Sequence, residues 1–121
     1  MLARRTATIL GVFLLIEGIW GLFSPVVFGV LTTNTAHAII HIVLGILGLF
    51  SRPMAFVGAY LVGVGTLLAL VGILYFVPGA SDLIVSILNV NGAVAWLNII
   101  VGVACVGIVL SAERNAPAPR A

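Results

Sequence analysis

Long stretches without a charged side chain constrain the fold of this chain more than any other feature. Two of them lie between Arg52 and Asp82 and between Asp82 and Glu113. Each exceeds the roughly 20 apolar residues that an α-helix needs to cross the hydrocarbon core of a bilayer. Hydrophobic residues make up 63% of the 121-residue chain and charged residues 7%, whereas soluble domains carry about 25% charged residues. The sequence therefore predicts an all-α integral membrane protein.

The apolar runs divide into four predicted transmembrane helices. Their expected bounds are residues 6–23, 35–50, 54–77 and 93–110. Together they predict a single membrane domain over residues 1–111, organised as a four-helix bundle. The remaining residues, 112–121, are rich in alanine and proline, so we expect them to form a disordered cytoplasmic tail.

Two connections between the predicted spans are apolar but too short to cross a membrane. Ser24 and Pro25 offer an N-cap and a first-turn proline, so we expect a brief helix at the membrane interface over residues 26–31. Residues 83–90 follow helical spacing, and Ser81 with Asp82 is their expected cap.

The positive charges predict the orientation of the chain in the membrane. All five are arginines, namely Arg4, Arg5, Arg52, Arg114 and Arg120. Four spans bring these positions to one side of the membrane, and the positive-inside rule makes that side cytoplasmic. We therefore expect a multi-pass protein of a bacterial inner membrane with both termini in the cytoplasm. The scattered arginines form no basic face, so no nucleic-acid partner is expected.

The sequence also indicates an internal repeat of a two-helix hairpin, with copies at about residues 1–50 and 51–111. One set of residues recurs 47 positions later (Arg5 at Arg52, Gly11 at Gly58, Gly18 at Gly65), and a second recurs 57 positions later (Asn34 at Asn91, Ala36 at Ala93, Ala38 at Ala95, His41 at Asn98, Gly45 at Gly102). Because each copy contains two spans, both copies keep the same orientation across the membrane.

Glycines recur on the predicted helices with spacings that suit close helix packing. The candidate packing positions are Gly11, Gly18, Gly45, Gly48, Gly58, Gly65, Gly72 and Gly102. Small residues at such spacings let the backbones of neighbouring membrane helices approach each other. The sequence therefore predicts a compact bundle.

The candidate functional residues are polar side chains inside the predicted spans. Glu17 is the only carboxylate there, and His37 and His41 are four residues apart, so they share one face of a helix. Counted from the outer ends of their spans, Glu17, His41 and Asn98 lie at nearly the same depth. We therefore expect these three to form an interior polar cluster, with His37 nearer the surface. An isolated charge in hydrocarbon is costly, so the carboxyl group is expected to hold a proton or a hydrogen bond from imidazole.

These motifs carry a family resemblance. The residues Asn34, His37, His41, Gly45, Gly48 and Leu49, followed by a second Asn-led copy in the last span, resemble the bacterial four-helix membrane proteins called the domain of unknown function 4383 family. The likeness covers most of the chain. It implies the fold and the membrane location, and it supplies no activity. The family usually carries a histidine in the last span, where this chain has Asn98.

The leading interpretation is a non-enzymatic structural or accessory component that packs with other membrane helices. Its expected partners are the lipid bilayer and either further copies of this chain or a larger membrane protein complex. The sequence contains no Gly-rich phosphate loop, no nucleophile-elbow motif and no acid pair, so we expect no catalytic residues and no enzyme.

Two alternatives remain open. In the first, His37 and His41 ligate a tetrapyrrole or a transition metal, with Glu17 as the candidate further ligand. The leading interpretation predicts no cofactor and no metal. In the second alternative, Glu17 relays protons or lines a solute path in a small carrier, as intramembrane carboxylates do in transporters.

Overall fold

Three long apolar helices dominate the structure. In this computed structural model, residues 2–51 and 53–114 are described. Helix α1 covers Leu2–Phe23, α3 covers Met54–Tyr75 and α5 covers Gly92–Arg114. All three are long and apolar enough to cross a membrane. Helix α5 continues past the expected end of the membrane domain at residue 111, and the rest of the predicted tail lies outside the described residues.

A fourth apolar helix, α2, covers Thr35–Leu49 and is shorter, at 15 residues. Asn34 caps its start, since the Oδ1 atom of Asn34 accepts a hydrogen bond from the backbone amide of His37 at 2.9 Å. This contact satisfies one of the amides that have no partner within the first turn of a helix. At 1.5 Å per residue, α2 is about 22 Å long. The four helices therefore form where the sequence predicts them, with α2 the shortest.

The expected interfacial helix over residues 26–31 is wrong, because this segment is a small β-hairpin. Strand β1 (Val26–Val27) pairs antiparallel with β2 (Leu31–Thr32). Phe28 and Gly29 between them have positive φ angles of 53° and 76°, which suit a hairpin turn and exclude a right-handed helix. The Ser24 hydroxyl bonds locally to Val26 and so does not cap a helix.

The second connection forms a short helix, as predicted, but starts earlier than its expected cap. Helix α4 covers Ala80–Leu88 and follows Gly79, whose φ angle is 87°. Its last backbone bond comes from Asn89, which adopts the left-handed conformation. A residue with this conformation is a common helix stop. None of the residues of α4 is buried.

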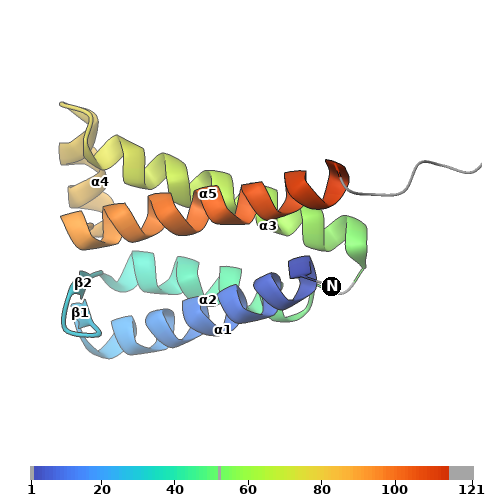
Figure 1. The fold of residues 1–121 in the computed structure, drawn as a ribbon. Helices are drawn as coiled ribbons and strands as arrows, with labels where there is room; N and C mark the ends of the chain where they lie inside the picture. The colour runs from blue at the N-terminus through green and yellow to red at the C-terminus, as the bar shows by residue number, and fades with distance from the viewer. Residues whose placement is uncertain (1, 52, 115–121) are drawn as a thin grey trace, which may run out of the picture.

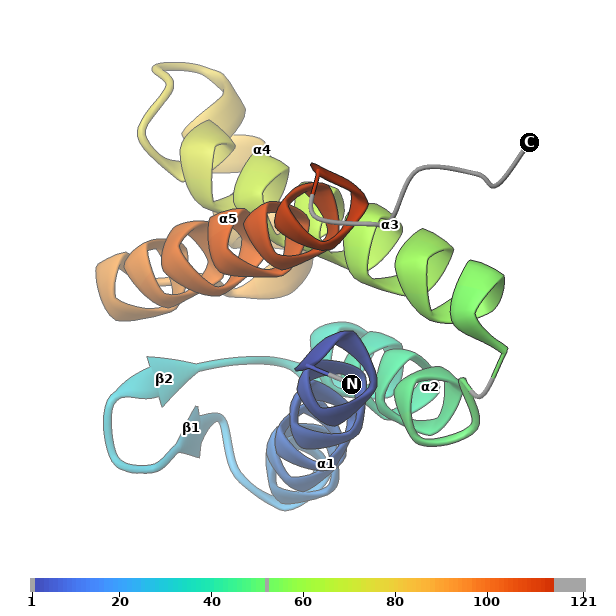
Figure 2. The ribbon, with the colours of Figure 1, turned by 45° about the vertical axis from the view of Figure 1, so that its right-hand side comes forward.

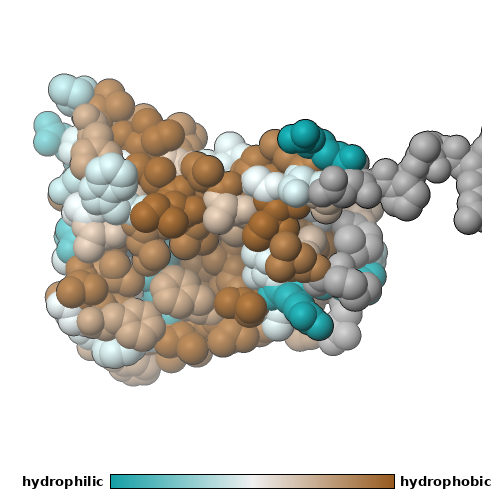
Figure 3. Space-filling model, in the orientation of Figure 1, coloured by the Kyte–Doolittle hydropathy of each residue, from teal (hydrophilic) through white to brown (hydrophobic). Residues whose placement is uncertain are grey.

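The helices are arranged as two antiparallel hairpins. Helix α1 packs chiefly against α2, and α3 chiefly against α5 (Figures 1 and 2). The β-hairpin and α4 lie at one end of the molecule, and the start of α1 and the end of α5 lie at the other (Figure 1). Hydrophobic side chains cover the middle of the face drawn in Figure 3, and hydrophilic patches lie towards its ends.

Within each hairpin, two glycines bring the helix backbones into direct contact. A Cβ atom at Gly11 would lie 2.8 Å from the carbonyl oxygen of Gly45, and one at Gly45 would lie 2.7 Å from that of Gly11. Gly65 and Gly102 make the same reciprocal approach, with a Cβ at Gly65 placed 2.8 Å from the Gly102 oxygen. Any larger residue at these four positions requires the helices to move apart.

The contacts follow a different register from the one expected in the sequence. Gly11 corresponds in its contacts to Gly65, so the sequence match of Gly11 with Gly58 is wrong by one heptad. A Cβ at Gly58 would meet only the Val109 side chain, at 3.9 Å. Because the glycines of α3 recur at heptad spacing, a shift by one heptad leaves the sequence pattern almost unchanged, and the pattern alone cannot fix the register.

The two hairpins meet through an apolar core at the end where α1 starts and α5 ends. Its buried residues are Ala3, Ala7, Leu10, Leu14, Val57, Tyr60, Leu61, Val64, Leu68, Cys105 and Val109. Tyr60 of α3 reaches across to α2, where its hydroxyl donates a hydrogen bond to the Leu44 carbonyl at 2.7 Å. Gly48 gives room for this ring, since a Cβ there would lie 2.8 Å from Tyr60 Cζ.

Candidate functional site

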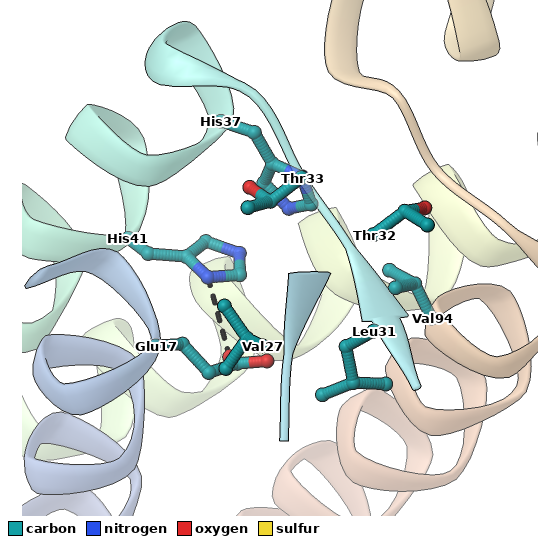
Figure 4. A pocket seen from close by; sticks show the side chains of 8 residues that line it. All are labelled: Glu17, Val27, Leu31, Thr32, Thr33, His37, His41 and Val94. Atoms are coloured by element: carbon teal, nitrogen blue, oxygen red, sulfur yellow. Dashed lines mark ion pairs between the residues drawn. The ribbon is translucent and has the colours of Figure 1, made fainter. Parts of the chain in front are cut away.

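The candidate site lies between α1 and α2, beneath the β-hairpin. Glu17 of α1 and His41 of α2 form a close acid–imidazole pair with 3.2 Å between Glu17 Oε2 and His41 Nδ1 (Figure 4). Both side chains are less than a tenth exposed. Helical geometry explains the pairing, because Gly18 follows Glu17 and lets α1 approach the Ala38 carbonyl, one turn before His41.

His37 extends this pair towards the end of the molecule that carries the loops. Its ring lies 4.3 Å from the His41 ring, centre to centre, with an angle of 78° between the two planes. The His37 Nδ1 atom lies 3.0 Å from the carbonyl oxygen of Leu88, the last residue of α4. Because a carbonyl oxygen only accepts hydrogen bonds, Nδ1 carries the proton. His37 thus connects the first hairpin to the loop of the second.

The β-hairpin covers the site, and the connection between α4 and α5 in the α3–α5 helical hairpin holds it in place. Val27 and Leu31 are buried over the polar pair and line the pocket in Figure 4. Thr32 Oγ1 donates a hydrogen bond to the Asn89 carbonyl at 2.6 Å, and Asn89 Nδ2 donates one to the Thr33 carbonyl at 2.8 Å. Asn89 thus holds the cover through two hydrogen bonds.

Two asparagines add a reciprocal connection above the site. Asn34, which caps α2, donates from Nδ2 to the Ile87 carbonyl at 2.7 Å. Asn91 accepts from the Val94 amide at 3.0 Å near the start of α5, and it donates from Nδ2 to the Val30 carbonyl at 2.8 Å. Each asparagine thus caps its own helix and bonds to the loop of the other hairpin. Sequence reasoning found both as repeat markers but missed this role, which their position immediately before a helix could have signalled.

The structure brings Glu17, His37 and His41 together but does not place Asn98 with them. Asn98 is buried in α5, yet it does not line the pocket around Glu17. The residues that line this pocket are Glu17, Val27, Leu31, Thr32, Thr33, His37, His41 and Val94. Equal depth along the helices therefore did not mean contact, because Asn98 belongs to the other hairpin.

The pocket is small and its ligand set is limited. Its free space corresponds to about one water molecule. Among the described residues, no three His, Cys, Asp or Glu side chains are placed to hold a metal ion together. Cys105, the single cysteine, lies in the apolar core away from this pocket. The pocket thus contains one carboxyl group and two imidazole rings around a space of about one water molecule.

Comparison with known proteins gives a family and no further relative. No curated protein matches this chain, and no solved structure matches it. A family model described as "Domain of unknown function (DUF4383)" matches residues 4–111. This match includes the whole of α2, the Glu17–His41 pair and both asparagine caps. With nearly all of its described helices inside the match, this apolar helical chain belongs to the DUF4383 family.

Proposed function

We propose that this protein is a non-enzymatic structural or accessory component of a bacterial inner membrane that packs with other membrane helices. The observation that carries the proposal is the pairing of Glu17 with His41 inside the chain. The interior ionisable groups bond to one another around a space of about one water, so the pocket offers a substrate little room. The apolar outer faces of the helices are then the surface that meets lipid or a partner.

Four membrane spans with cytoplasmic termini fit the arrangement of the helices. Helix α2 is shorter than α1, but it lies antiparallel to α1 and extends along most of it. Arg4, Arg5 and Arg114 lie near the end of the molecule where α1 starts and α5 ends. Arg52 and Arg120 fall outside the described residues. The positive-inside rule makes that end cytoplasmic.

Aromatic side chains at the opposite end fit a second membrane–water interface there. The Trp20 and Phe28 rings lie 5.0 Å apart, and the Phe76 and Trp96 rings lie 5.3 Å apart. Tryptophan and tyrosine are enriched at both membrane–water interfaces, where their amphipathic rings lie at the level of the lipid headgroups. One such pair belongs to each hairpin, which supports the same membrane depth for both hairpins.

The two hairpins are proposed to be copies of one unit, and the glycine contacts support this. The contacts that Gly11 and Gly18 make from α1 recur at Gly65 and Gly72 of α3. The second helices, α2 and α5, each contribute one matching glycine to these contacts, namely Gly45 and Gly102.

The asparagine bonds support the same proposal. Asn34 precedes α2 and bonds to Ile87 in the second hairpin, whereas Asn91 precedes α5 and bonds to Val30 in the first. The two bonds are therefore related by exchange of the hairpins, as expected for two copies of one unit.

Cofactor ligation is the second candidate function, and one observation favours it. Both histidines bond through Nδ1, His41 to a carboxylate and His37 to a carbonyl. Metal-ligating histidines usually have such a second partner, which leaves Nε2 directed at the metal. A metal analysis and a visible absorption spectrum of the purified protein test this candidate. A bound metal or chromophore that is lost in His41→Ala would replace the structural proposal.

The topology is tested with reporter fusions. A fusion after Ala121 and one inserted between Gly79 and Asn91 should give opposite localisation signals, with the first cytoplasmic. Matching signals from the two fusions would contradict four spans.

The accessory role is tested by photocrosslinking in native membranes. A crosslinking amino acid is placed singly at Ile9, Ile39, Ile73 and Ile100, which are 69%, 50%, 51% and 64% exposed. We expect one face to give a discrete protein adduct while the other positions give lipid adducts. The wild-type chain, expressed in excess without the label, should compete for the protein adduct. Lipid adducts at all four positions would defeat the accessory role.

A further inference from the structure

The proton position on His37 is fixed by its partner, which leaves one ring nitrogen as an acceptor. Nδ1 donates to the Leu88 carbonyl, so in the neutral imidazole the Nε2 atom carries a lone pair and no proton. His37 is 5% exposed, and burial of this kind disfavours the doubly protonated, charged ring. The His37 Nε2 atom therefore needs a hydrogen-bond donor.

The opposite assignment holds for His41, provided that the Glu17–His41 pair is neutral overall. A buried pair avoids a net charge by sharing one proton. Either Glu17 is ionised and His41 carries two protons, or Glu17 is protonated and donates to His41 Nδ1. In both of these forms His41 Nε2 carries a proton. The remaining neutral form, in which His41 Nδ1 donates to a protonated Glu17, is disfavoured because it leaves the carboxyl O–H without an acceptor among the described hydrogen bonds. The His41 Nε2 atom therefore needs a hydrogen-bond acceptor.

The two imidazole rings lie edge to face, and no hydrogen bond joins them directly. Their planes are inclined by 78°, with 4.3 Å between the ring centres, so the in-plane N–H group of one ring and the in-plane lone pair of the other are not aligned. Neither Nε2 atom has a partner among the described hydrogen bonds. Among the described residues, every side-chain nitrogen or oxygen that is fully buried does have a partner, so the two Nε2 atoms are not fully buried. Both atoms therefore border space that a water can reach.

We propose that one water molecule occupies the pocket and bridges the two histidines. It accepts a hydrogen bond from His41 Nε2 and donates one to His37 Nε2, which fits the space of about one water between Glu17, Thr33, His37 and His41 (Figure 4). The result is a directional chain from Glu17 through His41, the water and His37 to the Leu88 carbonyl.

On α1, these hydrogen-bonded groups have polar neighbours at one end of the helix only. Between Glu17 and the start of α1, the buried residues of the helix have no side-chain donor or acceptor; they are Leu14, Gly11, Leu10, Ala7 and Ala3. Leu88 and the threonines of the β-hairpin lie at the loop end. Along α1, the polar groups therefore continue towards the loop end only, and we infer that the site exchanges protons and water with that side.

The test is solid-state nitrogen NMR of the histidine-labelled full chain in lipid bilayers. We expect the His37 ring to be protonated at Nδ1 and bare at Nε2, the His41 ring to be protonated at Nε2, and both rings to receive magnetisation from water. A proton on His37 Nε2, or rings that receive no magnetisation from water, would overturn the proposal. A stoichiometric metal in elemental analysis would replace the water by an ion and overturn it as well.

Two variants distinguish an effect on the water bridge from an effect on the fold. Glu17→Gln keeps a donor for His41 Nδ1 through its amide group, so His41 should keep its Nε2 proton and its water contact. Thr66→Val is the matched control, because Thr66 is exposed on α3 and does not line this pocket; its histidine spectrum should equal that of the wild type. Loss of the His41 Nε2 proton in a folded Glu17→Gln protein would contradict the assignment.

Discussion

The two hairpins share one backbone arrangement but differ in what fills it. Reciprocal glycine contacts join α1 to α2 and α3 to α5. When the helices are aligned on these glycines, the matched positions are Glu17 and Val71, His37 and Val94, and His41 and Asn98. Val71 and Val94 belong to an apolar cluster with Val27 and Leu31. One hairpin therefore has a polar interior where the other is largely apolar.

This difference separates the packing of the hairpins from their chemistry. The α3–α5 pair approaches as closely as α1–α2, and its described residues form no acid–imidazole pair. We therefore infer that the glycines set the helix spacing and the polar cluster does not. The cluster lies where the first hairpin meets the loop of the second, through the bond of His37 to Leu88. We infer that the polar residues couple the two hairpins, whereas the glycines set the spacing within each hairpin.

The largest effect is expected at the glycines. Gly65→Leu and Gly11→Leu should each lower the free energy of unfolding in detergent by about 1–3 kcal/mol or more, since the added side chain meets backbone atoms that cannot move alone. Thermal unfolding measures both. Gly63→Leu is the control, because a Cβ at Gly63 meets nothing within 4 Å, and its stability should stay near that of the wild type. Equal stability of Gly65→Leu and Gly63→Leu would show that backbone contact does not set the spacing.

The next effect is expected at the polar cluster of the first hairpin. Glu17→Leu leaves His41 Nδ1 without its partner, and an unsatisfied buried group costs about 1–3 kcal/mol. Glu17→Gln retains a donor and an acceptor and should lose much less. The same detergent unfolding assay compares the two variants. If both lose the same stability, the negative charge itself is required and a hydrogen-bonded clasp is insufficient.

The sequence predicted the helices better than the connections and the register. Charge-free runs fix the long helices because only a helix satisfies its backbone in hydrocarbon. The β-hairpin was missed because Pro25 and Ser24 also suit a helix start, and the positive φ angles of Phe28 and Gly29 decide the outcome. The register was missed because a glycine heptad looks the same after a shift by one repeat.

The candidate site was predicted in part for a similar reason. Glu17 and His41 stand out because ionisable groups are rare inside membrane spans, and the structure pairs them at 3.2 Å. Asn98 was grouped with them on depth alone, whereas contact also depends on which hairpin a helix belongs to. The Leu88 carbonyl that binds His37 is a backbone group, and side-chain patterns carry no signal for it.

A smaller effect is expected at the two asparagines, and it should be similar in both. Asn34→Ala and Asn91→Ala each remove a helix cap and one bond to the opposite loop. Loss of an N-cap costs about 1 kcal/mol. Because the two residues make matching contacts, their losses in the unfolding assay should agree closely. A large loss in one variant only would show that the two loops are held by different interactions.

The smallest effect is expected from copying the second hairpin into the first. Glu17→Val with His41→Asn reproduces the pair Val71 and Asn98, which the α3–α5 interface already accommodates. Glu17→Val alone should destabilise the protein, since it leaves a buried imidazole unpaired, whereas removing both partners of a buried pair is often nearly neutral. The double variant should therefore unfold within about 0.5 kcal/mol of the wild type, and a double-mutant cycle should show strong coupling between the two positions. His37 keeps its bond to Leu88 in this variant, so the loop contact serves as the internal control. If the double variant loses the sum of the two single losses, the first hairpin depends on its polar interior in a way that the second does not, and the shared backbone arrangement is insufficient to hold it.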